Sequence, residues 1–168
     1  DVGSGSNNAV IGILAAVISR MRTGTGQHID VSMTDGMFPY HAVCGLQVLY
    51  GADEPGYATE VLNGGSLYGF YATADGRYLA FGGLEPQFLT AFLQVLGLEG
   101  YIAALMQPER LAEIRARICG VIRSQPLTYW VERFREVDAC VEPVLTVGEA
   151  LATPHVRERG LVVDVPAA

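Results

Sequence analysis

Hydrophobic and polar positions divide the first fifty residues of the chain into three predicted elements. Residues 9–21 are apolar at nearly every position, and apolarity on all sides is typical of a buried helix. A Thr-Gly-Thr-Gly stretch at 23–26 ends this helix, and residues 27–33 then alternate between apolar and polar side chains, which predicts a strand. A second helix is expected over residues 35–50, with Pro39 tolerated in its first turns.

The second half of the chain begins with a predicted hairpin. Alternating aromatic and apolar residues at 68–73 and 77–81 flank an Ala-Asp-Gly turn, and this arrangement strongly favours a hairpin. Hydrophobic spacing and capping residues predict the remaining elements: helices over 86–96, 108–123 and 126–137, a strand over 139–144, a short helix capped by Thr146, and a strand over 161–165. The chain therefore mixes helices and strands, and we assign it to the α/β class.

Residues 51–67 separate these two halves. They show no hydrophobic periodicity and contain Glu-Pro-Gly and Asn-Gly-Gly, and a segment of this length is a linker or a functional loop. We therefore place a boundary near residue 52. Residues 1–51 form an α/β part, residues 52–67 the linker, and residues 68–168 a mostly helical part that begins with the hairpin.

Composition and charge exclude several classes of protein. The 168 residues are 50% apolar, and 11 basic residues against 18 acidic ones give a net charge of −7. This excludes a disordered chain and a broad nucleic-acid-binding surface. Three cysteines without a C-x-x-C motif favour a reducing cytoplasm over a disulfide scaffold, and we expect no metal site. The longest apolar stretch, residues 9–18, is too short to cross a membrane, and it lacks a positively charged leader, so we expect no membrane contact.

The first candidate for chemistry is the carboxylate of Asp1. Gly3 and Gly5 follow it directly before the predicted helix. Backbone N–H groups at a helix start can bind an anion or stabilise the charge that develops on an oxygen. The alternative is that these residues only cap the helix.

Two further segments are candidates. Glu85 stands between an apolar strand and a helix that begins with Pro86, where burial and helix-terminal dipoles act on its charge in opposite directions. The alternative is an ordinary acidic residue near a helix N-terminus. Gly64 and Gly65 allow a backbone to approach a ligand closely, although an ordinary turn explains them as well. Cys140, in an apolar context, is expected to pack in the core.

Four segments together carry a resemblance to a known family. They are Arg22-Thr23-Gly24-Thr25-Gly26-Gln27-His28-Ile29-Asp30-Val31-Ser32-Met33, Ala74-Asp75-Gly76-Arg77-Tyr78, Gly83-Leu84-Glu85-Pro86-Gln87-Phe88 and Asp138-Ala139-Cys140-Val141-Glu142-Pro143-Val144-Leu145. With them the chain resembles the class III CoA-transferase superfamily, which includes formyl-CoA transferase, carnitine CoA-transferase and α-methylacyl-CoA racemase. The last two segments are most similar to the racemase branch.

The resemblance implies a fold and an assembly. Members of this superfamily are longer than this chain, and two copies interlock into a dimer. A Rossmann-like large domain carries CoA, and a small domain covers the thioester. Residues 1–51 would then end the large domain, residues 52–67 would be the linker, and residues 68–168 would belong to the small domain. Since the chain begins with Asp1 rather than Met, we expect it to be a piece of a longer protein.

The resemblance also implies roles for particular residues. Asp1 corresponds to the family's essential Asp, which is a nucleophile in the transferases and an acid/base group beside an upstream His in the racemases. Glu85 corresponds to a Glu that works from the other face in the racemases. Gly3, Gly5, Gly64 and Gly65 are expected to contact CoA. The family's Asp-Gly-Gly-Ala-Pro stretch is Asn-Gly-Gly-Ser-Leu at 63–67 here.

These roles predict an acyl-CoA racemase-like enzyme of fatty acid metabolism that epimerises 2-methylacyl-CoA through an enolate. One alternative is a transferase that moves CoA between carboxylic acids through an aspartyl acyl adduct. The other is a non-catalytic CoA-binding or dimerisation fragment. We expect CoA as part of the thioester substrate, no separate cofactor, an interlocked homodimer and a cytoplasmic location.

Overall fold

The computed structural model describes residues 1–42, 45–62, 64–163 and 165. It divides into two compact units, Asp1–Gly56 and Tyr57–Ala168. This division falls inside the predicted linker, residues 52–67.

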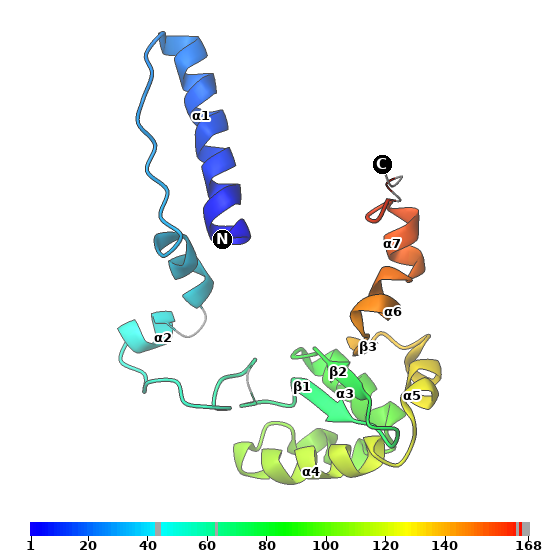
Figure 1. The fold of residues 1–168 in the computed structure, drawn as a ribbon. Coiled ribbons are helices and arrows are strands. Elements are labelled where there is room, and N and C mark those ends of the chain that lie inside the picture. Colours follow the sequence, from blue (N-terminus) through cyan, green and yellow to red (C-terminus); the bar gives the residue numbers. More distant parts are fainter. Residues whose placement is uncertain (43–44, 63, 164, 166–168) are drawn as a thin grey trace. The chain divides into compact units, whose positions relative to one another are not determined.

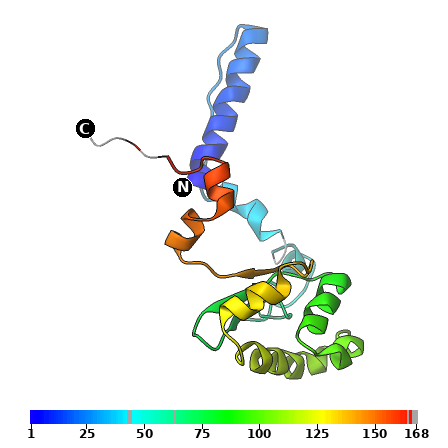
Figure 2. The same cartoon turned by 90° about the vertical axis from the view of Figure 1, so that its right-hand side faces the viewer.

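The first unit begins with one continuous helical rod. A short π-helical turn, η1 (Val2–Ser6), leads into α1 (Asn7–Thr23), which ends at Gly24 with a left-handed φ of 74°. The chain then returns along α1 in extended form (Figures 1 and 2). Ile29 lies so close to Gly12 that a β-carbon there would be 3.1 Å from its methyl group.

The strand predicted over residues 27–33 is wrong. The segment is extended, but none of its residues forms a strand, because a strand needs a neighbouring strand with which its backbone can pair. The helix predicted over residues 35–50 is also wrong as a single element. It is replaced by a 3-10 helix, η2 (Asp35–His41), and a short α2 (Gly45–Leu49). Pro39 lies inside η2 and lacks the N–H that a continuing α-helix requires. Cys44 lies outside the described residues.

The helix α1 is not buried in this unit, contrary to the sequence prediction. No residue of α1 is buried, and large apolar side chains such as Ile11 and Met21 are 64% and 81% exposed. By length and apolar composition alone, the rod from Val2 to Thr23 is also long enough to cross a membrane. Residues 9–18 were expected to be too short to cross a membrane. The helical rod is longer than this apolar stretch, because isolated polar residues do not interrupt the helix, so length does not exclude a membrane span. The expectation of no membrane contact stays a prediction.

The second unit is built on a small antiparallel sheet in the order β1-β2-β3. β1 (Gly69–Ala72) pairs with β2 (Tyr78–Phe81), and β2 pairs with β3 (Val141–Pro143). The predicted hairpin and the predicted strand at 139–144 are therefore confirmed. Gly76, with a φ of 73°, supplies the left-handed residue that the turn needs.

Helices cover this sheet and extend beyond it. They are α3 (Pro86–Val95), η3 (Glu99–Ala104), η4 (Pro108–Arg110), α4 (Leu111–Ile122), α5 (Leu127–Phe134), α6 (Val147–Leu151) and α7 (Pro154–Glu158). The helix α4 packs against β1, and α5 packs against β2 and β3 (Figure 1). The three longer predicted helices are confirmed, with α5 ending earlier than expected. The predicted last strand is wrong, since residues 161–163 and 165 form none.

Aromatic side chains from the sheet and the helices fill the core. Phe81 of β2 stacks on Phe92 of α3 with ring centroids 4.0 Å apart, and Phe92 lies 5.8 Å from Phe134 of α5. Trp130 is buried, and its indole N–H donates to the carbonyl of Ile122 at 2.9 Å. The predicted mixture of helix and sheet is confirmed, whereas the Rossmann-like domain and the interlocked dimer stay predictions.

Candidate functional site

Asp1 lies at the mouth of an open hollow in the first unit. The hollow has a volume of about 500 Å³ and is lined by Asp1, Gly3, Ser4, Met33, Thr34, Met37 and Tyr40. The hydroxyl of the buried Ser4 donates to the carbonyl of Met33, which fastens the start of the helix to the returning chain. Gly36 leaves no room for a side chain, since a β-carbon there would lie 2.8 Å from the amide of Asn8.

The backbone around Asp1 determines which N–H groups a ligand can use. The N–H groups of Gly5 and Ser6 donate to the carbonyl of Asp1 at 2.9 and 2.8 Å. Gly5 therefore cannot offer its N–H to a ligand, contrary to the simplest reading of the sequence. The N–H groups of Gly3 and Ser4 precede Gly5, whose N–H is the first of these donors to the carbonyl of Asp1, as expected for a helix start. Both residues line the hollow beside Asp1, but Ser4 is buried and Gly3 is exposed, so the N–H of Gly3 is the better candidate.

Glu85 is the N-cap residue of α3 in the second unit. Its backbone is extended, with a φ of −72° and a ψ of 145°, and its carbonyl accepts from the N–H groups of Phe88 and Leu89. Its carboxylate turns back and accepts from the N–H of Leu84 at 3.2 Å. The side chain is exposed within this unit, so the desolvation considered from the sequence does not arise within the unit.

Two glycines fix the backbone that leads to Glu85. A β-carbon on Gly83 would lie 2.7 Å from the β-carbon of Phe88 and 2.8 Å from the ring of Phe81. The N–H of Gly82 donates to the carbonyl of Cys140 at 2.8 Å. The two segments most similar to the racemase branch, residues 83–88 and 138–145, are therefore neighbours in space.

Cys140 is exposed, so its predicted place in the core is wrong. Its backbone has a φ of 52°, in the left-handed region that few side chains adopt. Desolvation raises the pKa of its thiol, and the nearby charges of Asp138 and Glu85 raise it further. Thiolate chemistry is thereby disfavoured at this position.

Gly64 and Gly65 belong to a tightly folded loop of the second unit. Gly64 has a φ of 90°, and the N–H of Gly65 donates to the carbonyl of Glu60 at 2.8 Å. Arg115 of α4 donates to the carbonyls of Gly64, Ser66 and Tyr68. Sequence analysis missed Arg115, because an arginine on an amphipathic helix carries no pattern that marks it.

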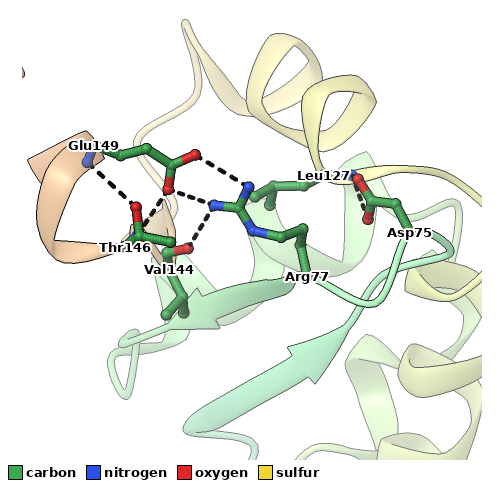
Figure 3. Close-up of polar contacts among 6 residues, drawn as sticks. All are labelled: Asp75, Arg77, Leu127, Val144, Thr146 and Glu149. Atoms are coloured by element: carbon green, nitrogen blue, oxygen red, sulfur yellow. Dashed lines mark hydrogen bonds and ion pairs between the residues drawn. The ribbon is translucent and has the colours of Figure 1, made fainter.

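The segment 74–78 is structural rather than catalytic (Figure 3). The carboxylate of Asp75 accepts from the N–H of Leu127 at the start of α5, and hydrogen bonds from Thr73 and then Leu127 lower its pKa. Arg77 forms an ion pair of 2.7 Å with Glu149 of α6. Hydrogen bonds from Thr146 and then Arg77 lower the pKa of Glu149, which forms a capping box with Thr146.

The structure therefore groups the predicted site residues in two places. Asp1, Gly3 and Gly5 belong to the first unit, and Glu85, Gly64 and Gly65 belong to the second. Within the described part of the chain, no three metal-ligating side chains gather in one place. What each unit offers is an exposed carboxylate beside a rigid glycine-containing backbone, which suits proton transfer or nucleophilic attack.

Comparison with known proteins gives the context for these groups. The family model described as CoA-transferase family III matches residues 1–168. Alpha-methylacyl-CoA racemase of Mus musculus is 35% identical over 161 residues, which cover 95% of this chain and 42% of the racemase. Succinate–glutarate CoA-transferase of Agrobacterium fabrum is 30% identical over an alignment of 170 positions, which covers 95% of this chain and 41% of that protein. The chain thus spans about two fifths of the length of these relatives.

A solved structure supports the same fold. The CAIB/BAIF family protein from Brucella suis superimposes with a TM-score of 0.71 at 22% identity, over 96% of this chain and 44% of that one. At this level of identity the likeness concerns the fold alone.

Proposed function

This chain belongs to CoA-transferase family III, and from that membership we propose that the intact protein epimerises 2-methylacyl-CoA thioesters, with Asp1 and Glu85 as opposing acid/base groups. The racemases and the transferase among its relatives support enzyme activity on CoA thioesters in the broad sense. The finer proposal depends on Glu85.

The chemistry needs two groups on opposite faces of one carbon. One carboxylate removes the proton next to the thioester carbonyl, which leaves a planar enolate and a carboxylic acid. The other group, which starts as the acid, gives its proton to the opposite face. The thioester is thereby regenerated with its centre inverted, and the two groups have exchanged their protonation states. Proton transfers of this kind require each group to be within hydrogen-bonding reach of the reacting carbon. The resemblance adds a histidine upstream of Asp1 that would share the proton on its side.

The enolate oxygen also needs fixed donors. Removing one such donor typically costs about 2.7–4 kcal/mol of transition-state stabilisation. The N–H of Gly3, beside Asp1 in the hollow, is suited to this role. We propose that Gly3 acts here and that Gly5 acts indirectly, by keeping its N–H on the carbonyl of Asp1.

One observation favours the racemase reaction over CoA transfer: the way in which Glu85 is held. A lone nucleophilic aspartate needs no second carboxylate. Glu85 nevertheless stands exposed on a backbone that Gly83 and the 138–145 segment fix firmly. Such support is expected of a group that must meet a substrate with accurate geometry.

The test measures racemisation of 2-methyloctanoyl-CoA by the intact protein in deuterated water, together with exchange of the α-proton. We expect Glu85→Gln to abolish racemisation, because the amide cannot return the proton. Glu99→Gln, which changes another exposed glutamate of the same unit, should leave racemisation unchanged. Full racemase activity in Glu85→Gln would rule out the two-base mechanism.

CoA transfer is the second candidate, and the Agrobacterium relative favours it. In that reaction the Asp1 carboxylate attacks the thioester carbonyl, CoA thiolate leaves, and a mixed anhydride forms on Asp1. Hydroxylamine added during turnover would trap this anhydride, and detection of the modified Asp1 by mass spectrometry would favour the transferase. Tight CoA binding without turnover of either kind in the intact protein would favour the non-catalytic alternative.

The remaining proposals follow from the same family membership. CoA enters as part of the thioester substrate, and no separate cofactor takes part. The intact protein forms an interlocked homodimer in the cytoplasm, makes no functional contact with a membrane or with nucleic acid, and serves the metabolism of branched fatty acids.

A further inference from the structure

Arg115 makes an unusual set of contacts for a helix residue. It is half-buried on α4, and its Nη2 donates to the carbonyls of Gly64 at 3.3 Å, Tyr68 at 3.5 Å and Ser66. No ion pair with a carboxylate is found for it among the described residues. The guanidinium therefore serves three backbone carbonyls of one loop.

Tyr71 of β1 contacts both Arg115 and the same loop. The guanidinium carbon of Arg115 lies 5.9 Å from the centroid of the Tyr71 ring, within the range of a cation–π contact. The hydroxyl of Tyr71 donates to the carbonyl of Leu67. Tyr71 is only 1% exposed, so its ring is fixed in the core. Through Arg115 and Tyr71, α4 and β1 together bind the carbonyls of residues 64, 66, 67 and 68.

The loop cannot change shape easily at its glycines. A side chain on Gly65 would overlap the backbone of Thr59 and Glu60. Gly64, with a φ of 90°, has a conformation that glycine adopts readily and other residues adopt with strain. The hydroxyl of Ser66 donates to the carbonyl of Val61 at 2.6 Å, which closes the loop on itself.

This loop lies next to the backbone that carries Glu85. A hollow of about 250 Å³ has Ser66 and Leu67 on its wall together with Gly83 and Leu84, the two residues before Glu85. A shift of the loop would therefore change the surroundings of Glu85. All three hydrogen bonds come from Nη2 of Arg115, and the rest of its planar guanidinium lies over the Tyr71 ring. Arginine suits this position better than lysine, because a lysine ammonium cannot stack in this planar way on an aromatic ring.

We infer that Arg115 is a positioning residue: it holds the Gly64–Tyr68 backbone in the conformation that receives the acyl-CoA thioester beside Glu85. The inference rests on the proposed function and on the expectation, taken from the family resemblance, that Gly64 and Gly65 contact CoA. Arg115 itself touches neither the substrate nor the reacting carbon. Its loss is therefore expected to weaken substrate binding more than it slows the chemical step.

The experiment measures KM and kcat for racemisation of 2-methyloctanoyl-CoA by the intact protein. For Arg115→Ala we expect KM to rise about tenfold while kcat changes less than about threefold, the pattern of lost binding. Arg117→Ala, on the exposed side of the same helix, should change neither constant. Methylguanidinium added to Arg115→Ala should lower KM again, which a merely structural defect would not show.

Two results would overturn the inference. One is an unchanged KM in Arg115→Ala. The other, if that variant does not fold, is an unchanged KM in Arg115→Lys, which keeps the charge but loses the planar guanidinium over the Tyr71 ring. The proposed function fails separately, through racemisation that survives Glu85→Gln. In that case direct binding of 2-methyloctanoyl-CoA to Arg115→Ala and Arg117→Ala still tests the role of Arg115.

Discussion

At the scale of single residues, the position of Glu85 depends on a neighbour that has no side chain. Gly83 is wedged between Phe81 and Phe88, so the backbone passes closest to the core just before it turns outward to Glu85. The carbonyl of Glu85 accepts from the N–H groups of Phe88 and Leu89. Its exposed carboxylate accepts from the N–H of Leu84 and can still face a ligand. Rigidity at Gly83 and exposure at Glu85 are thus linked.

Replacement of Gly83 tests this link. We expect Gly83→Ala to lower the free energy of unfolding by about 1–3 kcal/mol, since the added methyl group overpacks the core. Gly82→Ala is the matched control, because a β-carbon there finds its nearest atom at 3.5 Å. Urea unfolding of the intact protein measures both. Equal stability of the two variants would contradict the packing argument.

Tyr71 gives a prediction about pH. Burial raises the pKa of its phenol from 10.0 to about 12, against the opposing charge of Arg115. Between these values the phenol of the unfolded chain loses its proton and that of the native protein keeps it. The contribution of this phenol to the free energy of unfolding is therefore complete below pH 10 and is lost as the pH rises through 12. The rise in pKa corresponds to a contribution of about 3 kcal/mol. We expect Tyr71→Phe to show a smaller loss of stability over this range, and an identical pH profile for both proteins would contradict this.

At the scale of elements, sequence patterns predicted best where an element is complete by itself or pairs with a close neighbour. The hairpin of β1 and β2 follows from its Asp-Gly turn, and α3 and α5 follow from their apolar stripes and initial prolines. The strand expected over 27–33 does not form. Alternation of apolar and polar residues indicates that a segment has two different faces, but not that a partner strand is present. Instead of the single helix expected over 35–50, a 3-10 helix runs from Asp35 through Pro39 to His41, and a separate α2 covers Gly45–Leu49.

The ion pair between Arg77 and Glu149 gives a prediction at this scale. Arg77→Ala should loosen α6, since the same carboxylate completes the capping box with Thr146 (Figure 3). We expect faster amide hydrogen exchange over residues 147–151 and unchanged exchange in α4. Arg157→Ala is the control, because within the described part of the chain Arg157 forms no ion pair. Unaltered exchange in Arg77→Ala would show that the pair does not hold the helix.

The same contact has an expected dependence on pH. The pKa of Glu149 is lowered from its usual 4.5 by its hydrogen bonds. The native state therefore favours the charged form, and the contribution to stability is present above pH 4.5 and disappears as the pH falls through the lowered pKa. Protection of residues 147–151 should fall on acidification in the wild type, and less so in Glu149→Gln.

At the scale of the whole molecule, the sequence names two candidate carboxylates, one in each unit, but not the contacts around them. Asp1 and Glu85 are proposed from motifs, which record residue types at fixed spacing, and their roles stay predictions. The contacts of Arg115 and the neighbourhood of Gly82 and Cys140 were not found, because they join residues that are far apart along the chain. The apolar composition of α1 suggested burial for a related reason. Composition indicates that a helix has an apolar surface to cover, but not which part of the protein covers it.

The exposed apolar face of α1 gives a prediction for this chain alone. Its large exposed side chains, among them Ile11, Leu14 and Ile18, form the kind of surface that mediates association. We expect the isolated chain to dimerise or aggregate in light scattering. A monodisperse monomer would contradict this expectation.

The central claim is that two carboxylates act on one carbon from opposite sides. The most direct measurement is a crystal structure of the intact protein with bound 2-methyloctanoyl-CoA. We predict that carboxylate oxygens of Asp1 and Glu85, from one protomer or from two, lie within about 3.5 Å of the α-carbon on its opposite faces. Side chains of Asp1 and Glu85 directed into separate cavities, with only one of them near the thioester, would contradict the account.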